Sequence, residues 1–201
     1  MQLGQGIFLF VLALGVAFFS YNAQRLVRYL RIARPEYRLN DIPKRLWNLL
    51  TIGFAQTKIL RDPVAGPLHA LVFWGFLILQ IGALEILIQG VVRGFSYGSI
   101  LPEPLHWLFL LSQELTAGAV LVAVGALLYR RLIVRPKRLQ GDRVHSGDAV
   151  LILAMIGGLM ITLMLVSAAH RVIDDAYPLA VQPVSAPLSA IFSALQMGPD
   201  T

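Results

Sequence analysis

Cysteine is absent from this chain of 201 residues, and charged residues are scarce. Without cysteine the sequence has no disulfide, no thiolate nucleophile and no sulfur ligand for zinc or an iron–sulfur cluster. Asp, Glu, Lys and Arg make up 14% of the residues, against about a quarter in an ordinary soluble domain. Hydrophobic residues make up 57%, and they are gathered into long runs between charged linkers. This distribution indicates a chain whose solvent is a lipid bilayer.

Four apolar runs are long enough to cross about 30 Å of hydrocarbon as helices. A backbone in lipid must satisfy its own hydrogen bonds, so we expect each run to be helical. The predicted fold class is therefore all-α, an integral membrane bundle with four transmembrane helices. The predicted spans are residues 3–21, 68–92, 105–129 and 149–169.

The basic residues predict how these helices are oriented in the membrane. Nine of the 17 Lys and Arg lie between Arg25 and Arg61, and six lie between Arg130 and Arg143. By the positive-inside rule both linkers are cytoplasmic, which places the N-terminus outside, in the periplasm. The net charge of +6 could indicate a nucleic-acid partner. Its confinement to the short linkers argues against nucleic acid.

Two segments outside the spans also have a pattern. Between residues 43 and 61 apolar residues recur at helical spacing, which predicts an amphipathic helix on the cytoplasmic membrane surface. The alternative is a helix packed on a partner subunit. Residues 172–201 form a proline-punctuated periplasmic segment whose apolar part, residues 188–197, is too short to span. We interpret that part as the approach to a fifth helix that the chain lacks, which suggests a fragment or a split gene.

His69 is the most informative ionisable residue because it stands near the start of the second span. Phe73 and Phe76 follow it on the same helical face. A neutral imidazole at the mouth of an aromatic-lined groove suits an axial ligand of a buried haem. The alternative is an interfacial histidine that is hydrogen-bonded to a neighbouring helix.

The other three histidines do not supply an obvious second ligand. His106 begins the third span and His170 ends the fourth, so both are expected about 30 Å from His69 across the bilayer. His145 is on the same side as His69, but its neighbours resemble a helix start. Within this chain, no other histidine is therefore a convincing second haem ligand to accompany His69.

Two carboxylates fall within the outer half of the predicted spans, Glu85 and Glu114. Ionisable groups in a membrane are costly, so each is a candidate for function. The functional hypothesis is that they relay protons during quinol oxidation. The alternative is a structural hydrogen bond between helices.

Several short motifs together resemble a known family of membrane subunits. They are residues 56–60 (QTKIL), 66–69 (GPLH), 73–77 (FWGFL), 129–136 (YRRLIVRP) and 146–153 (SGDAVLIL). In order and spacing they are similar to the membrane cytochrome b domain of the respiratory nitrate reductase gamma subunit. The greatest similarity is to the N-terminal membrane domain of fused heterodisulfide-reductase-like iron–sulfur oxidoreductases of the electron-transfer flavoprotein:menaquinone type.

This resemblance implies five transmembrane helices, an N-terminus outside the bacterial inner membrane, and haem b between the second and fifth helices. It implies that His69 is the axial ligand from the second helix. The chain departs from the nitrate reductase pattern because no second histidine follows His69 in this helix. The fifth helix, with its histidine, and the cysteine-rich domains are also absent, so we expect one haem at most.

The leading hypothesis is a membrane haem b electron-transfer domain in a quinone-linked oxidoreductase of the respiratory chain. Electrons would pass between menaquinone and a cytoplasmic iron–sulfur module, with electron-transfer flavoprotein as a further candidate partner. The predicted haem-site residues are His69, with Phe73 and Phe76 in the pocket, and no catalytic residue is assigned to this chain. One alternative is a haem-free membrane anchor that docks an iron–sulfur subunit. Transport is a weaker alternative, because the chain shows no internal repeat.

Overall fold

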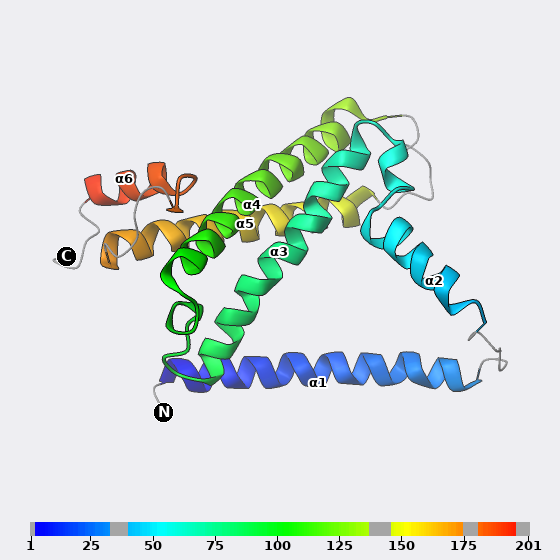
Figure 1. Ribbon diagram of the computed structural model, residues 1–201, viewed down its shortest axis with the longest axis horizontal. Helices are drawn as coiled ribbons and strands as arrows, with labels where there is room; N and C mark the ends of the chain where they lie inside the picture. Colours follow the sequence, from blue (N-terminus) through cyan, green and yellow to red (C-terminus); the bar gives the residue numbers. More distant parts are fainter. Residues whose placement is uncertain (1–2, 33–39, 137–145, 175–180, 196–201) are drawn as a thin grey trace. The chain divides into compact units, whose positions relative to one another are not determined.

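The computed structural model describes residues 3–32, 40–136, 146–174 and 181–195. All regular structure in these residues is helical, so the prediction of an all-α fold is confirmed. Four described helices are long and apolar enough to cross a membrane. They are α1 (Leu3–Ile32), α3 (Ala65–Val91), α4 (Glu103–Tyr129) with its π-helical extension η4 (Arg130–Val134), and α5 (Ser146–Asp174) (Figure 1).

Shorter helical segments connect or follow these four. They are α2 (Ile42–Asn48), the π-helix η1 (Leu49–Phe54), the 3-10 turns η2 (Ile59–Arg61) and η3 (Tyr97–Ser99), and α6 (Ala186–Ala194). The chain separates into two compact units, and α3 contributes residues to both. One unit contains residues 1–55 and 84–96, and the other contains residues 56–83 and 97–201.

The first and fourth long helices continue beyond the predicted spans. α1 runs past residue 21 to Ile32. In this extension the Arg25 Nε donates to the Tyr29 hydroxyl 2.9 Å away, one turn further along. Side chains four residues apart share a helix face, so such pairs support a helix outside the apolar run. α5 likewise reaches Asp174 instead of ending near residue 169.

The helix predicted over residues 43–61 is shorter than expected. α2 and η1 together end at Phe54, and Gln56 takes the left-handed backbone conformation with φ 50°. The Gln56 carbonyl then accepts hydrogen bonds from the amides of Ile59 and Leu60, at 2.9 and 3.0 Å. A left-handed residue cannot continue a right-handed helix, so the chain turns here. The interfacial position of this segment stays a prediction.

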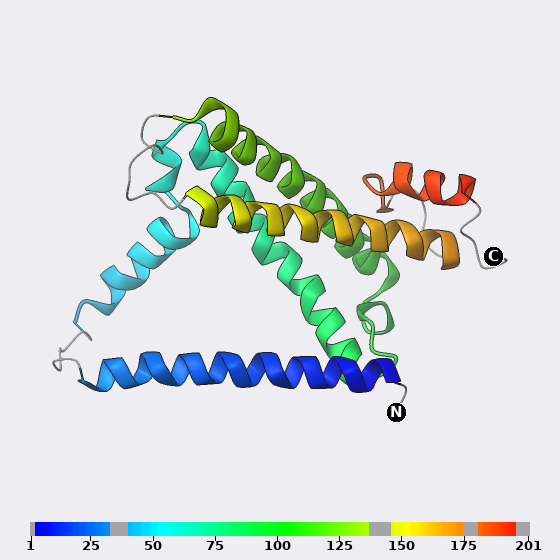
Figure 2. The same cartoon turned by 180° about the vertical axis from the view of Figure 1, so that it is seen from behind.

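The core of the larger unit is the contact between α4 and α5. Ala117, Val120, Val124, Met160 and Met164 are buried there. Partly buried side chains of α3 and α6, among them Val72, Leu79 and Leu188, pack against this cluster. Figures 1 and 2 both show α3 running beside α4, and α6 beside the C-terminal part of α5. The hydrophobic cluster therefore joins four helices of this unit.

Glycine permits the close approach of α3 and α4. A Cβ added at Gly75 would lie 2.3 Å from the Val120 Cγ2, which no real side chain tolerates. Further along, the Gln113 side-chain amide donates to the Ile78 carbonyl at 3.1 Å. Small residues and polar cross-links of this kind are typical of helices that associate within a membrane.

In the smaller unit, α1 contacts the last part of α3. A Cβ at Gly90 would lie 2.2 Å from the Phe8 ring, so the two segments touch at a glycine. The Arg93 Nε donates to the Gln5 Oε1 at 2.8 Å. α1 has no buried residue, and Phe10, Phe18 and Phe19 are all more than half exposed.

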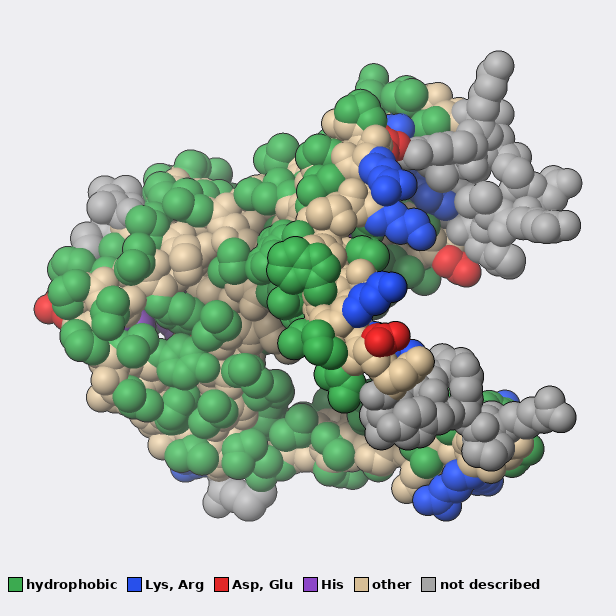
Figure 3. All heavy atoms as spheres, turned by 45° about the vertical axis from the view of Figure 1, so that its right-hand side comes forward, with side chains coloured by type: hydrophobic (Ala, Val, Ile, Leu, Met, Phe, Trp, Pro, Cys, Tyr) green, Lys and Arg blue, Asp and Glu red, His purple; other side chains and the backbone are tan. Residues whose placement is uncertain are grey.

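Hydrophobic side chains cover much of the face shown in Figure 3, while Lys and Arg gather in separate groups. Exposed apolar side chains on this scale are unusual for a protein that is surrounded by water. They are expected where lipid tails surround the helices.

Candidate functional site

His69 lies in the second turn of α3, and the local sequence explains why the helix starts before it. The Asp62 Oδ1 accepts hydrogen bonds from the amides of Val64 and Ala65, at 3.0 and 2.8 Å. These are amides that the start of a helix would otherwise leave unpaired. A Cβ at Gly66 would lie 2.5 Å from the Ile59 carbonyl oxygen, so glycine is needed where η2 packs on this turn.

Gln56 orients the His69 ring. The His69 Nδ1 lies 3.2 Å from the Gln56 Oε1, which can only accept a hydrogen bond. With the Gln56 amide in this orientation, the tautomer that makes the bond carries a proton on Nδ1 and none on Nε2. Gln56 is 3% exposed, and its left-handed backbone is held by two amide hydrogen bonds from η2. The fold thus holds the Gln56 side chain beside the His69 ring and favours that tautomer.

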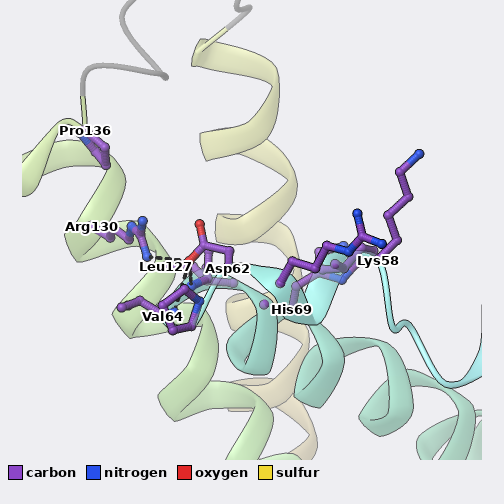
Figure 4. A pocket seen from close by; sticks show the side chains of 12 residues that line it. Lys58, Asp62, Val64, His69, Leu127, Arg130 and Pro136 are labelled. Carbon is purple, nitrogen blue, oxygen red and sulfur yellow. Dashed lines mark hydrogen bonds and ion pairs between the residues drawn. The ribbon is translucent and has the colours of Figure 1, made fainter. Parts of the chain in front are cut away.

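An open hollow of about 1040 Å³ lies where η2 and the start of α3 meet the end of α4. His69 lines it, together with the charged residues Lys58, Arg61, Asp62 and Arg130. The remaining lining residues are Ile59, Pro63, Val64, Ala65, Gly66, Leu127 and Pro136. Figure 4 shows Arg130 and Asp62 facing each other, with His69 and Lys58 on the other side of Asp62 in this view. The hollow thus combines one imidazole, three cations and one carboxylate.

Asp62 and Arg130 form an ion pair across this hollow. The Arg130 Nη1 lies 3.7 Å from the Asp62 Oδ1, and each side chain is about one-fifth exposed, at 20%. This separation is too long for a hydrogen bond. The Nη1 is buried and has no hydrogen-bond partner in the described part of the chain.

The two phenylalanines predicted to accompany His69 are not among the residues that line the hollow. Phe76 is 58% exposed. Phe73 is half-buried, and its ring meets the neighbouring Trp74 ring edge to face at a centroid distance of 5.9 Å. The described residues therefore do not bring these rings and His69 together in one pocket.

The other two described histidines, His106 and His170, stand near helix ends that do not border the hollow. His106 belongs to the first turn of α4 and is buried against Gly98, where an added Cβ would meet its ring at 2.9 Å. His170 is exposed near the end of α5. Neither lines the hollow that contains His69. His145 lies outside the described residues.

Glu114 is buried, at 6% exposed, and binds the start of α6. Its Oε2 accepts from the Ser185 amide and its Oε1 from the Ser185 hydroxyl, each at 3.0 Å. A Cβ at Gly118, one turn along, would lie 3.1 Å from a methyl carbon of Val184. Glu114 thus holds a segment distant in sequence against α4, as the structural alternative requires.

Glu85 is half-buried in the smaller unit, where the Ser96 hydroxyl donates to its Oε1 at 3.1 Å. Glu85 and Glu114 therefore belong to different compact units. No group of three or more His, Cys, Asp or Glu side chains in the described segments is arranged to hold a metal ion.

Sequence reasoning missed several residues that shape this site. Asp62 carried a recognisable signal, because an Asp shortly before an apolar helix is a typical helix-start residue. Gln56 and Arg130 lie in motifs that carry the family resemblance, but nothing in the motifs predicts their contacts, and Ser185, the partner of Glu114, carried no signal. Their roles depend on contacts with residues that are distant in sequence, as Ser185 shows with Glu114.

The fold and the site define a multi-pass, all-α protein with a basic, histidine-containing hollow at one end of two long helices. The chain matches no protein-family model and no solved structure. It is similar to two curated oxidoreductases. It is 33% identical over 161 residues to the probable iron-sulfur-binding oxidoreductase FadF of Bacillus subtilis (strain 168). It is 22% identical over 187 residues to the EtfAB:quinone oxidoreductase of Syntrophomonas wolfei subsp. wolfei.

These similarities cover most of this chain and a small part of each relative. The matched residues are 79% of the chain and 22% of FadF, and 92% of the chain and 26% of the EtfAB:quinone oxidoreductase. The chain therefore spans about a quarter of the length of the relatives it matches. These two similarities confirm the predicted relationship to iron–sulfur and quinone-linked oxidoreductases, over the part of each relative that the chain matches.

Proposed function

We propose that the chain is the membrane electron-transfer domain of a quinone-linked iron–sulfur oxidoreductase. The names of the two relatives support the redox class, and the four long apolar helices support a location within the membrane. In this proposal electrons pass between menaquinone and an iron–sulfur module, with electron-transfer flavoprotein as the soluble partner. The iron–sulfur clusters belong to that module, because this chain has no cysteine.

The proposal places the chain in the bacterial inner membrane with a periplasmic N-terminus. The observation behind it is the concentration of Lys and Arg in two alternate linkers. The hollow beside His69 then opens toward the cytoplasm, the side on which the iron–sulfur module would dock.

The cofactor in this proposal is one haem b, with His69 as an axial ligand. The observation that carries it is the 3.2 Å contact between the His69 Nδ1 and the Gln56 Oε1. When Nδ1 donates in this contact, Nε2 is the nitrogen that would hold the iron, beside a hollow of about 1040 Å³. Histidines that bind metals usually donate their other ring N–H to such an acceptor. When bound, haem supplies one-electron transfer; Gln56 holds the tautomer and the orientation of the ring.

The described residues provide no second histidine at this end of the helices. The second axial ligand would therefore come from a segment that the structure does not describe or from a partner. The support for this arrangement is the resemblance of the short sequence motifs to the nitrate reductase gamma family, which implies haem b between two helices. Phe73 and Phe76 remain candidate pocket residues only because their helical spacing places them on the same face as His69.

Glu85 and Glu114 are the candidate proton relays for quinol oxidation in this proposal. The paired hydrogen bonds between Glu114 and Ser185 favour a structural role for Glu114. Glu85, which accepts from the Ser96 hydroxyl, stays a relay candidate.

Reduced-minus-oxidised spectra of the purified chain test the haem proposal, with and without an added membrane helix that carries a histidine. We expect a haem b spectrum that His69→Ala abolishes. His106→Ala is the matched control because His106 lies at the other end of α4 and should leave the spectrum unchanged. A haem b spectrum that survives His69→Ala would remove His69 from the site.

The second candidate function is a haem-free anchor that binds an iron–sulfur subunit through its basic linkers. The absence of a second ligand near His69 in the described residues favours it. The anchor is supported if the protein co-purifies with an iron–sulfur subunit but contains no haem, both with and without the added histidine-bearing helix.

A further inference from the structure

The hollow beside His69 has an excess of positive charge. Its lining includes three basic side chains, Lys58, Arg61 and Arg130, and one acidic side chain, Asp62. Lys58 and Arg61 are exposed, and Arg130 is four-fifths covered. The hollow can therefore attract an anion from solution or from a membrane surface.

Asp62 does not neutralise this charge completely. Its Oδ1 already accepts two amide hydrogen bonds from the start of α3 and lies 3.7 Å from the Arg130 Nη1. That nitrogen is buried and lacks a hydrogen-bond partner in the described residues. A buried donor without an acceptor costs free energy, and a guanidinium is well matched to phosphate oxygens. Arg130 lines the hollow and its side chain is 20% exposed, so a small rotation of the guanidinium would present this nitrogen to a phosphate oxygen.

The rest of the hollow is suited to a lipid. Ile59, Val64 and Leu127 give it apolar walls beside the cations. It lies at one end of α3 and of the helix formed by α4 and η4, both of which are long and apolar enough to cross a bilayer. In a membrane the hollow would be at the level of the headgroups. Basic pockets at this level bind anionic lipid headgroups.

We propose that this hollow binds an anionic phospholipid, whose phosphate accepts from Arg130 and Arg61 and whose chains contact the apolar wall. Lys58 stands at the rim and adds attraction without a fixed contact. None of its anion-binding groups is a proposed haem ligand, so failure of the haem proposal leaves the lipid proposal standing. His69 lines the same hollow, where haem and lipid would compete for space, so the lipid affinity is measured on haem-free protein.

Native mass spectrometry of the full chain in detergent tests the proposal. Phosphatidylglycerol is titrated against zwitterionic phosphatidylcholine, and the bound fraction gives an apparent Kd for each. We expect phosphatidylglycerol to bind more tightly, and Arg130→Gln to weaken it about tenfold, as loss of one charged hydrogen bond does. Arg61→Gln should weaken it as well, and Arg130→Lys should retain part of the affinity.

Arg25→Gln is the matched control. It removes one positive charge from α1, outside the hollow, where Arg25 contacts Tyr29. Equal phosphatidylglycerol affinity in the wild type, Arg130→Gln and Arg61→Gln would overturn the proposal. So would an equal loss in Arg25→Gln, because the attraction would then be a property of net charge. Full displacement of the lipid by excess inorganic phosphate would assign the site to a free anion instead of a phospholipid.

Discussion

At the residue scale, the contact that matters most for the proposed function is between Gln56 and His69. Gln56→Leu keeps a side chain of similar size and removes the acceptor, so both ring tautomers become available. We expect haem affinity to fall about ten- to a hundredfold, the usual loss when the hydrogen-bond partner of a metal-binding histidine is removed. Haem titration followed by absorbance measures the change. Gln113→Leu, which removes a different side-chain amide that bonds to α3, should leave haem affinity within the error of the wild type.

A second prediction at the residue scale concerns Asp62. Asp62→Ala removes the acceptor for two amides at the start of α3 and the ion-pair partner of Arg130. We expect a loss of about 0.5–2 kcal/mol in stability, the usual cost of losing a helix cap. Thermal unfolding in detergent, followed by circular dichroism, measures it. Glu103→Ala removes an acidic residue from the first turn of α4, where no side-chain cap bond is made, and should cost less.

At the scale of helices, Gly75 determines how closely α3 and α4 approach. Gly75→Val places atoms within the volume of Val120, so the helices must separate. We expect a destabilisation of about 1–3 kcal/mol, typical of overpacking. Gly125→Ala, in the same pair of helices, meets open space and should be neutral or slightly stabilising. A Gly75→Val protein as stable as the wild type would contradict this packing.

Glu114 joins another pair of helices, because its carboxylate binds the residue that precedes α6. Glu114→Ala leaves the Ser185 amide and hydroxyl without these acceptors, at a cost of about 1–3 kcal/mol. Hydrogen exchange should then become faster across residues 185–194. Ser189→Ala is the control, because the Ser189 hydroxyl donates to the Ala186 carbonyl within α6 and makes no hydrogen bond to α4 in the part of the chain that the structure describes. Equal protection of α6 in Glu114→Ala and the wild type would show that the carboxylate does not hold it.

At the scale of the whole molecule, the orientation in the membrane can be tested because the chain has no cysteine of its own. Asn40→Cys lies in the first basic linker, and Gly94→Cys lies between α3 and α4. A membrane-impermeant maleimide added to intact cells should label the variant at position 94 and not the one at position 40. Both variants should be labelled after lysis, which is the control. Labelling at position 40 but not at position 94 in intact cells would show that the N-terminus is cytoplasmic.

Local sequence patterns predicted the long helices well and their ends poorly. An apolar run of about 20 residues requires a helix in lipid wherever it occurs, so no tertiary contact is needed to recognise it. Where a helix ends depends on weaker effects. α1 continues through a basic stretch that hydropathy excludes, and the linker helix ends early because Gln56 adopts a left-handed conformation.

The sequence by itself determined the all-α class and the four apolar helices, because these depend on composition and local spacing. Only the tertiary structure decided what surrounds His69. It brought Gln56 to the imidazole and Arg130 into the same hollow, and it gave Glu114 a partner in Ser185. The physical reason is that one buried hydrogen bond or ion pair joins residues far apart in sequence. Such pairs leave no periodic pattern in the chain, so packing alone reveals them.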